Sequence, residues 1–167
     1  CIHTYFWLIG HEIDFLFSKL KDYRPDNIPS FPFYRLMGEI RNLDPAFWPH
    51  LQGTNVQVIN LSANAIEDTK ATNFSQSLRG TRVKEVELMA NIIEGIQAIN
   101  LQGTRVHTVG LSYNQITAAG GTREFAQNLR GTEVKTINLT GNKIGDAGVI
   151  EFAQNLQETN VEEVILW

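Results

Sequence analysis

The sequence predicts an α/β solenoid, in which short parallel strands alternate with helical segments along a repeated unit. Two observations predict this fold class. The stretch "LTGNKIGDAGVIEFAQNLQET" at 139–159 repeats the skeleton of "LSYNQITAAGGTREFAQNLRGT" at 111–132. In addition, threonines recur in steps of 23 to 28 residues, and each is followed by the same apolar and polar pattern; they are Thr54, Thr81, Thr104, Thr132 and Thr159. A period of this length is typical of a stacked repeat array.

Each unit begins with a pattern that predicts a strand. Apolar residues stand two, five and seven places after the threonine, as in Val134, Ile137 and Leu139. Because β-branched residues and leucine suit the buried strands of a parallel sheet, we expect these side chains to pack inward and successive strands to form one parallel sheet. An asparagine follows ten places after the threonine, as Asn64, Asn91, Asn114 and Asn142. Its amide can hydrogen-bond the backbone of the turn that leaves the sheet.

The second half of each unit carries a helical pattern. In residues 148–157 the apolar residues recur at spacings of three and four, as Val149, Phe152, Ala153 and Leu156. We therefore expect a helix that buries this stripe against the back of the sheet. Glycines stand where the helix must end, a position that favours left-handed backbone; they are Gly80, Gly103 and Gly131. The second unit is four or five residues short, so we expect only a cramped helical turn there.

The stretch "VKTINLTGNKIGDAGVIEFAQNL" at 134–156 resembles a leucine-rich repeat of the ribonuclease-inhibitor type. The resemblance extends over about residues 46–167, as about four units and a final strand. It implies a curved horseshoe with the parallel sheet on the concave face and the helices on the convex face. That family includes inhibitors, immune receptors and repeat-bearing effectors secreted by intracellular bacteria. The Asn- and Gln-rich units resemble the effectors.

Residues 1–45 lie outside the period. The segments "HEIDFLFSKLKDY" and "FYRLMGEIRNL" each have apolar residues at helical spacing, and the proline-punctuated "RPDNIPSFP" between them should not be helical. Because solenoids need terminal units with a polar outer face, we expect residues 1–45 to form a helical N-terminal cap on the first strand. A separate helical domain that continues upstream is the alternative.

Composition excludes several classes of partner. A net charge of -4 and a pI near 5.5 provide no basic field for a phosphate backbone, so we expect no nucleic-acid partner. The apolar stretch from Ile2 to Ile9 is too short to span a bilayer, so we expect no membrane partner. A single cysteine excludes an intramolecular disulfide and favours an intracellular, cytoplasmic protein, or one secreted into a host cell if it is a bacterial effector. Sequons at Asn60, Asn73 and Asn138 leave a glycosylated exterior protein as the alternative.

The sequence contains none of the common motifs of catalysis or metal binding. It has no phosphate-binding glycine loop with lysine, no nucleophile elbow and no paired histidines at helical metal spacing. The stretch "HEIDF" begins like a zinc-protease helix, but Phe15 stands where the second histidine would be needed. We therefore predict neither an enzyme nor a protein that needs a metal or cofactor.

The candidate site is the concave face of the sheet. Because side chains alternate along a strand, the residues that flank the buried positions point to this face. Met89, His107, Tyr113 and Trp167 provide the apolar and amphipathic area of a protein interface. Charged residues around them would steer the partner; they are Lys84, Glu87, Lys135 and Glu162. We predict a protein-binding module. A substrate-recruiting or scaffold arm of a larger enzyme or regulatory protein is the alternative.

The last strand pattern, "VEEVILW" at 161–167, suggests an open sheet edge. Such an edge invites pairing with another strand. Either further repeats follow, or the edge docks on a second copy of the chain, with Val161, Val164 and Leu166 sealing the stack of a homodimer.

Overall fold

The computed structural model describes residues 51–53 and 56–166. The predicted helical cap of residues 1–45, the predicted start of the repeats at residue 46, and Trp167 lie outside the described residues. Within the described part of the chain, no helix is both long and apolar enough to cross a bilayer.

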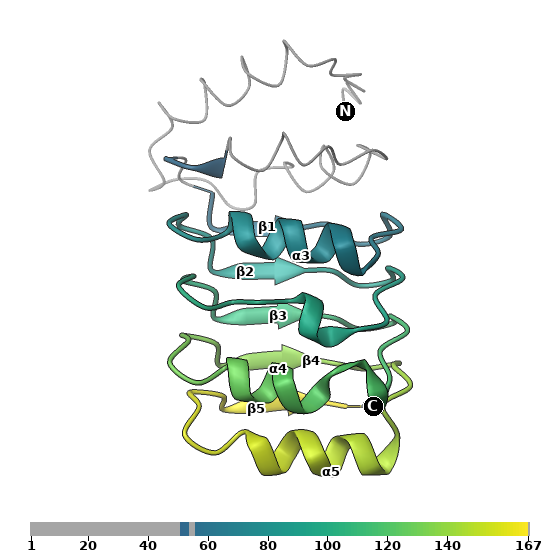
Figure 1. The fold of residues 1–167 in the computed structure, drawn as a ribbon. Helices are drawn as coiled ribbons and strands as arrows, with labels where there is room; N and C mark the ends of the chain where they lie inside the picture. Colours follow the sequence, from purple (N-terminus) through teal and green to yellow (C-terminus); the bar gives the residue numbers. More distant parts are fainter. Residues whose placement is uncertain (1–50, 54–55, 167) are drawn as a thin grey trace.

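The strand pattern produces one parallel sheet whose strand order follows the sequence (Figure 1). The strands are β1 (Val58–Asn60), β2 (Glu85–Glu87), β3 (Thr108–Gly110), β4 (Thr136–Asn138) and β5 (Glu163–Ile165). Their register places equivalent residues of successive units side by side, namely Ile59, Val86, Val109, Ile137 and Val164. The predicted parallel sheet and its register are therefore confirmed for the described units.

The helices lie on one side of this sheet (Figure 1). They are α3 (Asp68–Ser77), α4 (Thr122–Asn128) and α5 (Gly145–Asn155). The short second unit has only the 3-10 turn η3 (Ile96–Ala98) at the corresponding place, and a further turn, η4 (Ala118–Gly120), precedes α4. The cramped turn that its length predicts is therefore confirmed.

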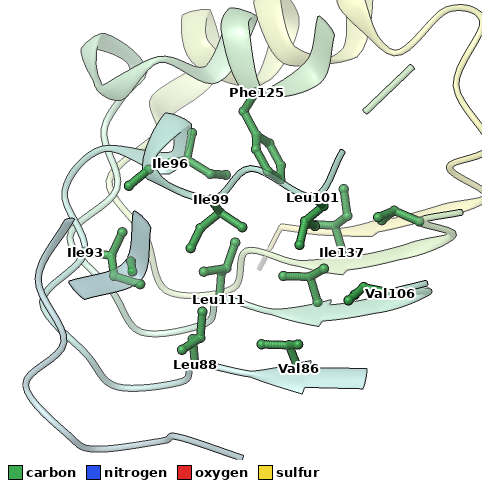
Figure 2. Packing of buried hydrophobic residues seen from close by; sticks show 14 of the residues in the cluster. Val86, Leu88, Ile93, Ile96, Ile99, Leu101, Val106, Leu111, Phe125 and Ile137 are labelled. Carbon is green, nitrogen blue, oxygen red and sulfur yellow. The ribbon is translucent and has the colours of Figure 1, made fainter. Parts of the chain in front are cut away.

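The core lies between the sheet and the helices (Figure 2). The inward strand residues are buried, as are residues of the helical segments such as Ile96 and Phe125. The rings of Phe125 and Phe152 stack across α4 and α5, with their centroids 6.1 Å apart. Each fully buried side chain of this size contributes about 1.5 to 3 kcal/mol through the hydrophobic effect, so the repeated pattern supplies the main stabilisation.

One residue that the helical pattern predicts to be buried is exposed in the structure. Phe152 is buried and Val149 and Leu156 pack partly against the core, but Ala153 is exposed. The equivalent residue of the previous unit, Ala126, is fully buried. This helical position faces the next unit rather than the sheet. The position is covered on α4 by α5, whereas no described helix follows α5.

The asparagines that recur at one position of the repeat form a hydrogen-bonded ladder between units. Asn91 Nδ2 donates to the carbonyl oxygens of Leu61 (3.0 Å) and Leu88 (2.9 Å), while its Oδ1 accepts the backbone N–H groups of Asn64 (2.9 Å) and Ile66 (3.0 Å). Asn114 and Asn142 donate to the two equivalent carbonyl oxygens one and two units later, and the Oδ1 of each accepts one backbone N–H, from Ile93 and Ile116 respectively. Asn91, Asn114 and Asn142 therefore each connect their own unit to the unit before it.

The glycines predicted to end the helical segments have left-handed backbone. The φ angles of Gly80, Gly103 and Gly131 are 75°, 72° and 73°. A side chain at these positions would be strained, so the prediction from sequence is confirmed.

Candidate functional site

The sheet has one face that no described helix covers, which we call the open face. It consists of the outward side chains of β1 to β5 together with those of the turns that follow each strand. Because side chains alternate along each strand, Val86 points into the core while Glu85 and Glu87 lie on the open face. The predicted site residues Lys84, Glu87, Met89, His107, Tyr113, Lys135 and Glu162 all belong to this face or its edges. Trp167 lies outside the described residues.

One ion pair and one histidine–carboxylate hydrogen bond connect neighbouring units on the open face. Lys135 Nζ lies 2.6 Å from Glu162 Oε1, and His107 Nε2 lies 2.9 Å from Glu133 Oε2. Exposed pairs of this kind contribute at most about 1 kcal/mol to stability. Lys84 is exposed and forms no ion pair with any described residue. The predicted steering charges are therefore of two kinds, those already paired within the protein and those that are not.

Glu87 is the half-buried carboxylate of this face. Its Oε1 accepts the backbone N–H of Met89 at 3.0 Å, and a methyl group added to Gly110 on the neighbouring strand would overlap with the carboxylate. Burial removes water from the carboxylate and raises the pKa of Glu87, while hydrogen bonds from the backbone of Met89 and Leu88 act in the opposite direction. The missing side chain at Gly110 thus provides the space in which the carboxylate lies.

Exposed apolar side chains gather in the turns that follow β2 and β3. Met89 is 39% exposed, Ile92 43% and Tyr113 60%. The two turns are joined by a hydrogen bond from the Ala90 N–H to the Ser112 carbonyl oxygen, at 2.9 Å. We call Met89, Ile92 and Tyr113 the apolar rim. Ile92 was missed at the sequence level because it lies in the turn, beyond the strand alternation; its only signal is that other units have Ala65, Gln115 and Lys143 there.

Tyr113 has a backbone conformation that is rare for a bulky residue. Its φ angle is 54°, in the left-handed region. Equivalent positions in the other units have small residues, namely Ala63, Ala90 and Gly141. The Tyr113 ring lies over Gly141, since a methyl group there would come within 2.6 Å of the ring atom Cδ1. The aromatic side chain is therefore held across the next turn and is largely exposed.

The structure divides the predicted site residues into two groups. Glu87 stands on β2 and Met89 and Tyr113 in the turns that follow β2 and β3, with the Tyr113 ring over Gly141, whereas Lys135 and Glu162 pair with each other at the start of β4 and β5. Among the residues that the structure describes, no group of three or more His, Cys, Asp or Glu side chains is arranged to hold a metal ion. The arrangement on this face is suited to contacts of apolar, aromatic and charged side chains with another macromolecule.

Comparison with known families identifies the repeat itself. The sequence pattern of the leucine-rich repeat family matches residues 132–153, which contain β4 and the first part of α5. A comparison with curated proteins finds no match. The matched repeat has the same strand, asparagine and core positions as the other described units. The chain therefore carries a leucine-rich repeat in an α/β repeat architecture, and this motif is typical of protein–protein interaction.

Proposed function

We propose that this protein binds a partner protein through the open face of its sheet. In the ribonuclease-inhibitor type that the repeats resemble, this face would be concave and would surround part of the partner. Tyr113 is the observation that carries the proposal. Its aromatic ring is exposed on the open face, and its backbone is held in the left-handed region, which glycine alone adopts without strain.

The cost of Tyr113 to the fold favours a role in binding. Left-handed backbone costs about 1 to 2 kcal/mol for a residue with a Cβ. Alanine or glycine serves in the same turn of the other units, so the turn itself does not need an aromatic ring. A ring that is 60% exposed also recovers little of this cost through burial. Tyrosine is enriched among the residues that dominate binding energy in protein interfaces, which explains why it would be retained here.

The polar pairs of the open face support orientation of the partner. The Lys135–Glu162 ion pair and the His107–Glu133 hydrogen bond lie at the end of the open face where the strands begin, and the apolar rim lies at the other end. Exposed charges of this kind contribute more to the association rate and to the choice of partner than to affinity. We therefore assign affinity to Met89 and Tyr113, and orientation to the charged residues.

Affinity capture from cell lysate tests this proposal with two matched variants. The open-face variant carries Met89→Ala and Tyr113→Gly, and the control carries Ile150→Ala and Gln154→Ala on the helix side, where Ile150 is 57% exposed. We expect the wild type and the control to retain the same protein and the open-face variant to lose it. Equal retention by all three would contradict the proposal.

Unfolding in urea shows whether these variants keep their fold. Glycine adopts the φ angle of 54° without strain, so Tyr113→Gly should be at least as stable as Tyr113→Ala. Loss of binding by a fully folded open-face variant then reports the loss of contacts rather than the loss of structure.

A further inference from the structure

We infer that the partner presents a basic side chain to Glu87, together with an apolar side chain that contacts Met89 and Tyr113. The expected occupant is therefore a protein segment in which arginine or lysine stands close to an apolar residue. This inference rests on the proposed function and specifies the chemistry of the partner.

The position of Glu87 favours a cation. Its carboxylate is half-buried on β2 beside Gly110, and the donors to it are the backbone N–H groups of Met89 and Leu88. No cationic side chain of the described residues lies within ion-pair distance of it. A carboxylate that has lost part of its hydration without gaining a counter-charge is destabilised. A basic side chain from a partner would supply the missing charge.

Equivalent positions in other units show that the fold does not need this charge. Asn60 Oδ1 accepts the Ser62 N–H at 2.9 Å, and Asn138 Oδ1 accepts the Thr140 N–H at 3.0 Å. These neutral amides cap the backbone two residues ahead, as Glu87 does for Met89. The raised pKa of Glu87 supports the conclusion that its negative charge is disfavoured in the unbound protein. The charge therefore has a use other than capping the turn.

The remaining charges on the open face also favour a basic partner. Lys135 and His107 are already paired, with Glu162 and Glu133. The carboxylates without an ion pair in the described part of this face are Glu85, Glu87 and Glu163, against the cations Lys84 and Arg105. Arg82 and Arg105 stand before β2 and β3, five residues ahead of Glu87 and Gly110, which is about 16 Å along an extended chain. An unpaired excess of carboxylates attracts a basic segment and repels an acidic one.

The neighbouring apolar residues suit the rest of such a segment. Tyr113 offers an exposed ring face, on which a guanidinium group can stack. Met89 follows Glu87 by two residues, and its flexible thioether adapts to varied apolar side chains. Tyr113 stands three residues beyond Gly110, in the turn that follows β3. Because Met89 and Tyr113 follow the level of Glu87 by two and three residues, an extended partner segment should carry its basic and apolar side chains within about three residues of each other.

Selection from a random library of short displayed peptides tests the inference on the whole chain. The wild type should enrich peptides that contain arginine or lysine near an apolar residue. A synthetic peptide of an enriched sequence should bind the Glu87→Gln variant with a Kd about ten- to hundred-fold higher, as expected for loss of a charge-assisted hydrogen bond. The matched control, Glu163→Gln on β5, should change the Kd less than about three-fold because that carboxylate lies three strands away.

The outcomes separate this inference from the proposed function. Enrichment of acidic or uncharged peptides, or an unchanged Kd for Glu87→Gln, would overturn the partner chemistry. If those peptides still require Met89 and Tyr113, the proposed function stands. If no enriched peptide depends on the open face, both are overturned. Glutamine retains an oxygen for the Met89 N–H, so Glu87→Gln should stay folded, and urea unfolding verifies this.

Discussion

Replacement of Asn91 by alanine should destabilise the protein by about 2 to 6 kcal/mol. The side-chain oxygen of Asn91 is the only acceptor that the structure shows for the buried N–H groups of Asn64 and Ile66. Leaving a buried donor unsatisfied costs about 1 to 3 kcal/mol, and two donors are affected. Leu61 would also lose the donor to its carbonyl oxygen. Since small proteins are stable by only about 5 to 15 kcal/mol, this single change should remove a large share of the total.

Asn64 offers a matched comparison at the same place in the repeat. It is buried like Asn91, but its side chain donates only to the Ser62 carbonyl oxygen, and its Oδ1 has no hydrogen-bond partner. Asn64→Ala should therefore cost less than Asn91→Ala. Asn128→Ala, at an exposed position on α4, should change stability by less than about 0.5 kcal/mol.

Urea unfolding followed by circular dichroism measures all three variants. The expected order of destabilisation is Asn91, then Asn64, then Asn128. If Asn91→Ala unfolds within about 0.5 kcal/mol of the wild type, or if Asn64→Ala costs as much as Asn91→Ala, the ladder does not stabilise the stack as argued.

Three further predictions concern the core, a close helix contact and pH. Leu139→Ala should cost about 2 to 5 kcal/mol in urea unfolding because it leaves a cavity beneath β4; a loss below about 1 kcal/mol would contradict its core position. Gly148→Ala should lower thermal stability by about 1 to 3 kcal/mol because its methyl group would lie 2.7 Å from the Ala118 Cβ; an unchanged melting temperature would show that α5 can shift. Burial raises the pKa of Glu87, so the folded state favours the neutral carboxyl. The stability that this neutral carboxyl contributes is fully present below pH 4.5, the ordinary pKa, and is lost as the pH rises through the higher pKa of the folded state. The stability of Glu87→Gln relative to the wild type should therefore increase with pH above 4.5, and parallel pH profiles in both proteins would refute this.

The sequence predicts those parts of the fold that depend on contacts within one unit or between identical positions. Val86 and Ile137 are predicted as inward strand residues, and the register confirms that they align with their equivalents. The prediction that Ala153 is buried is wrong because the burial of this position depends on what the next unit places beside it. The same pattern buries Ala126 under α5 and leaves Ala153 exposed. Periodicity within a helix therefore identifies its apolar stripe but does not show which residues of that stripe the neighbouring unit covers.

The candidate site is predicted less completely, for a similar reason. That Lys135 and Glu162 are neighbours follows from their equivalent positions in adjacent units. The half-burial of Glu87 needs both the register and the glycine at position 110, so it emerges only when the strands are placed together. The left-handed backbone of Tyr113 follows from a turn whose other examples contain alanine or glycine. The N-terminal cap, the involvement of Trp167 and the homodimer through the β5 edge stay predictions.

The asparagine ladder has a consequence for how such a chain can change over generations. Asn91, Asn114 and Asn142 each satisfy groups of their own unit and of the one before it, so two units with this pattern can be neighbours in any order. Duplication or loss of a whole unit by recombination would preserve the same hydrogen bonds between neighbouring units. A single-residue insertion between the threonine and the asparagine would shift every strand side chain to the opposite face. The ten-residue interval between these two residues is identical in all four units, whereas the steps between threonines vary from 23 to 28. Related chains built from such units should therefore vary in repeat number and in the helical half of each unit, while the strand half keeps its length.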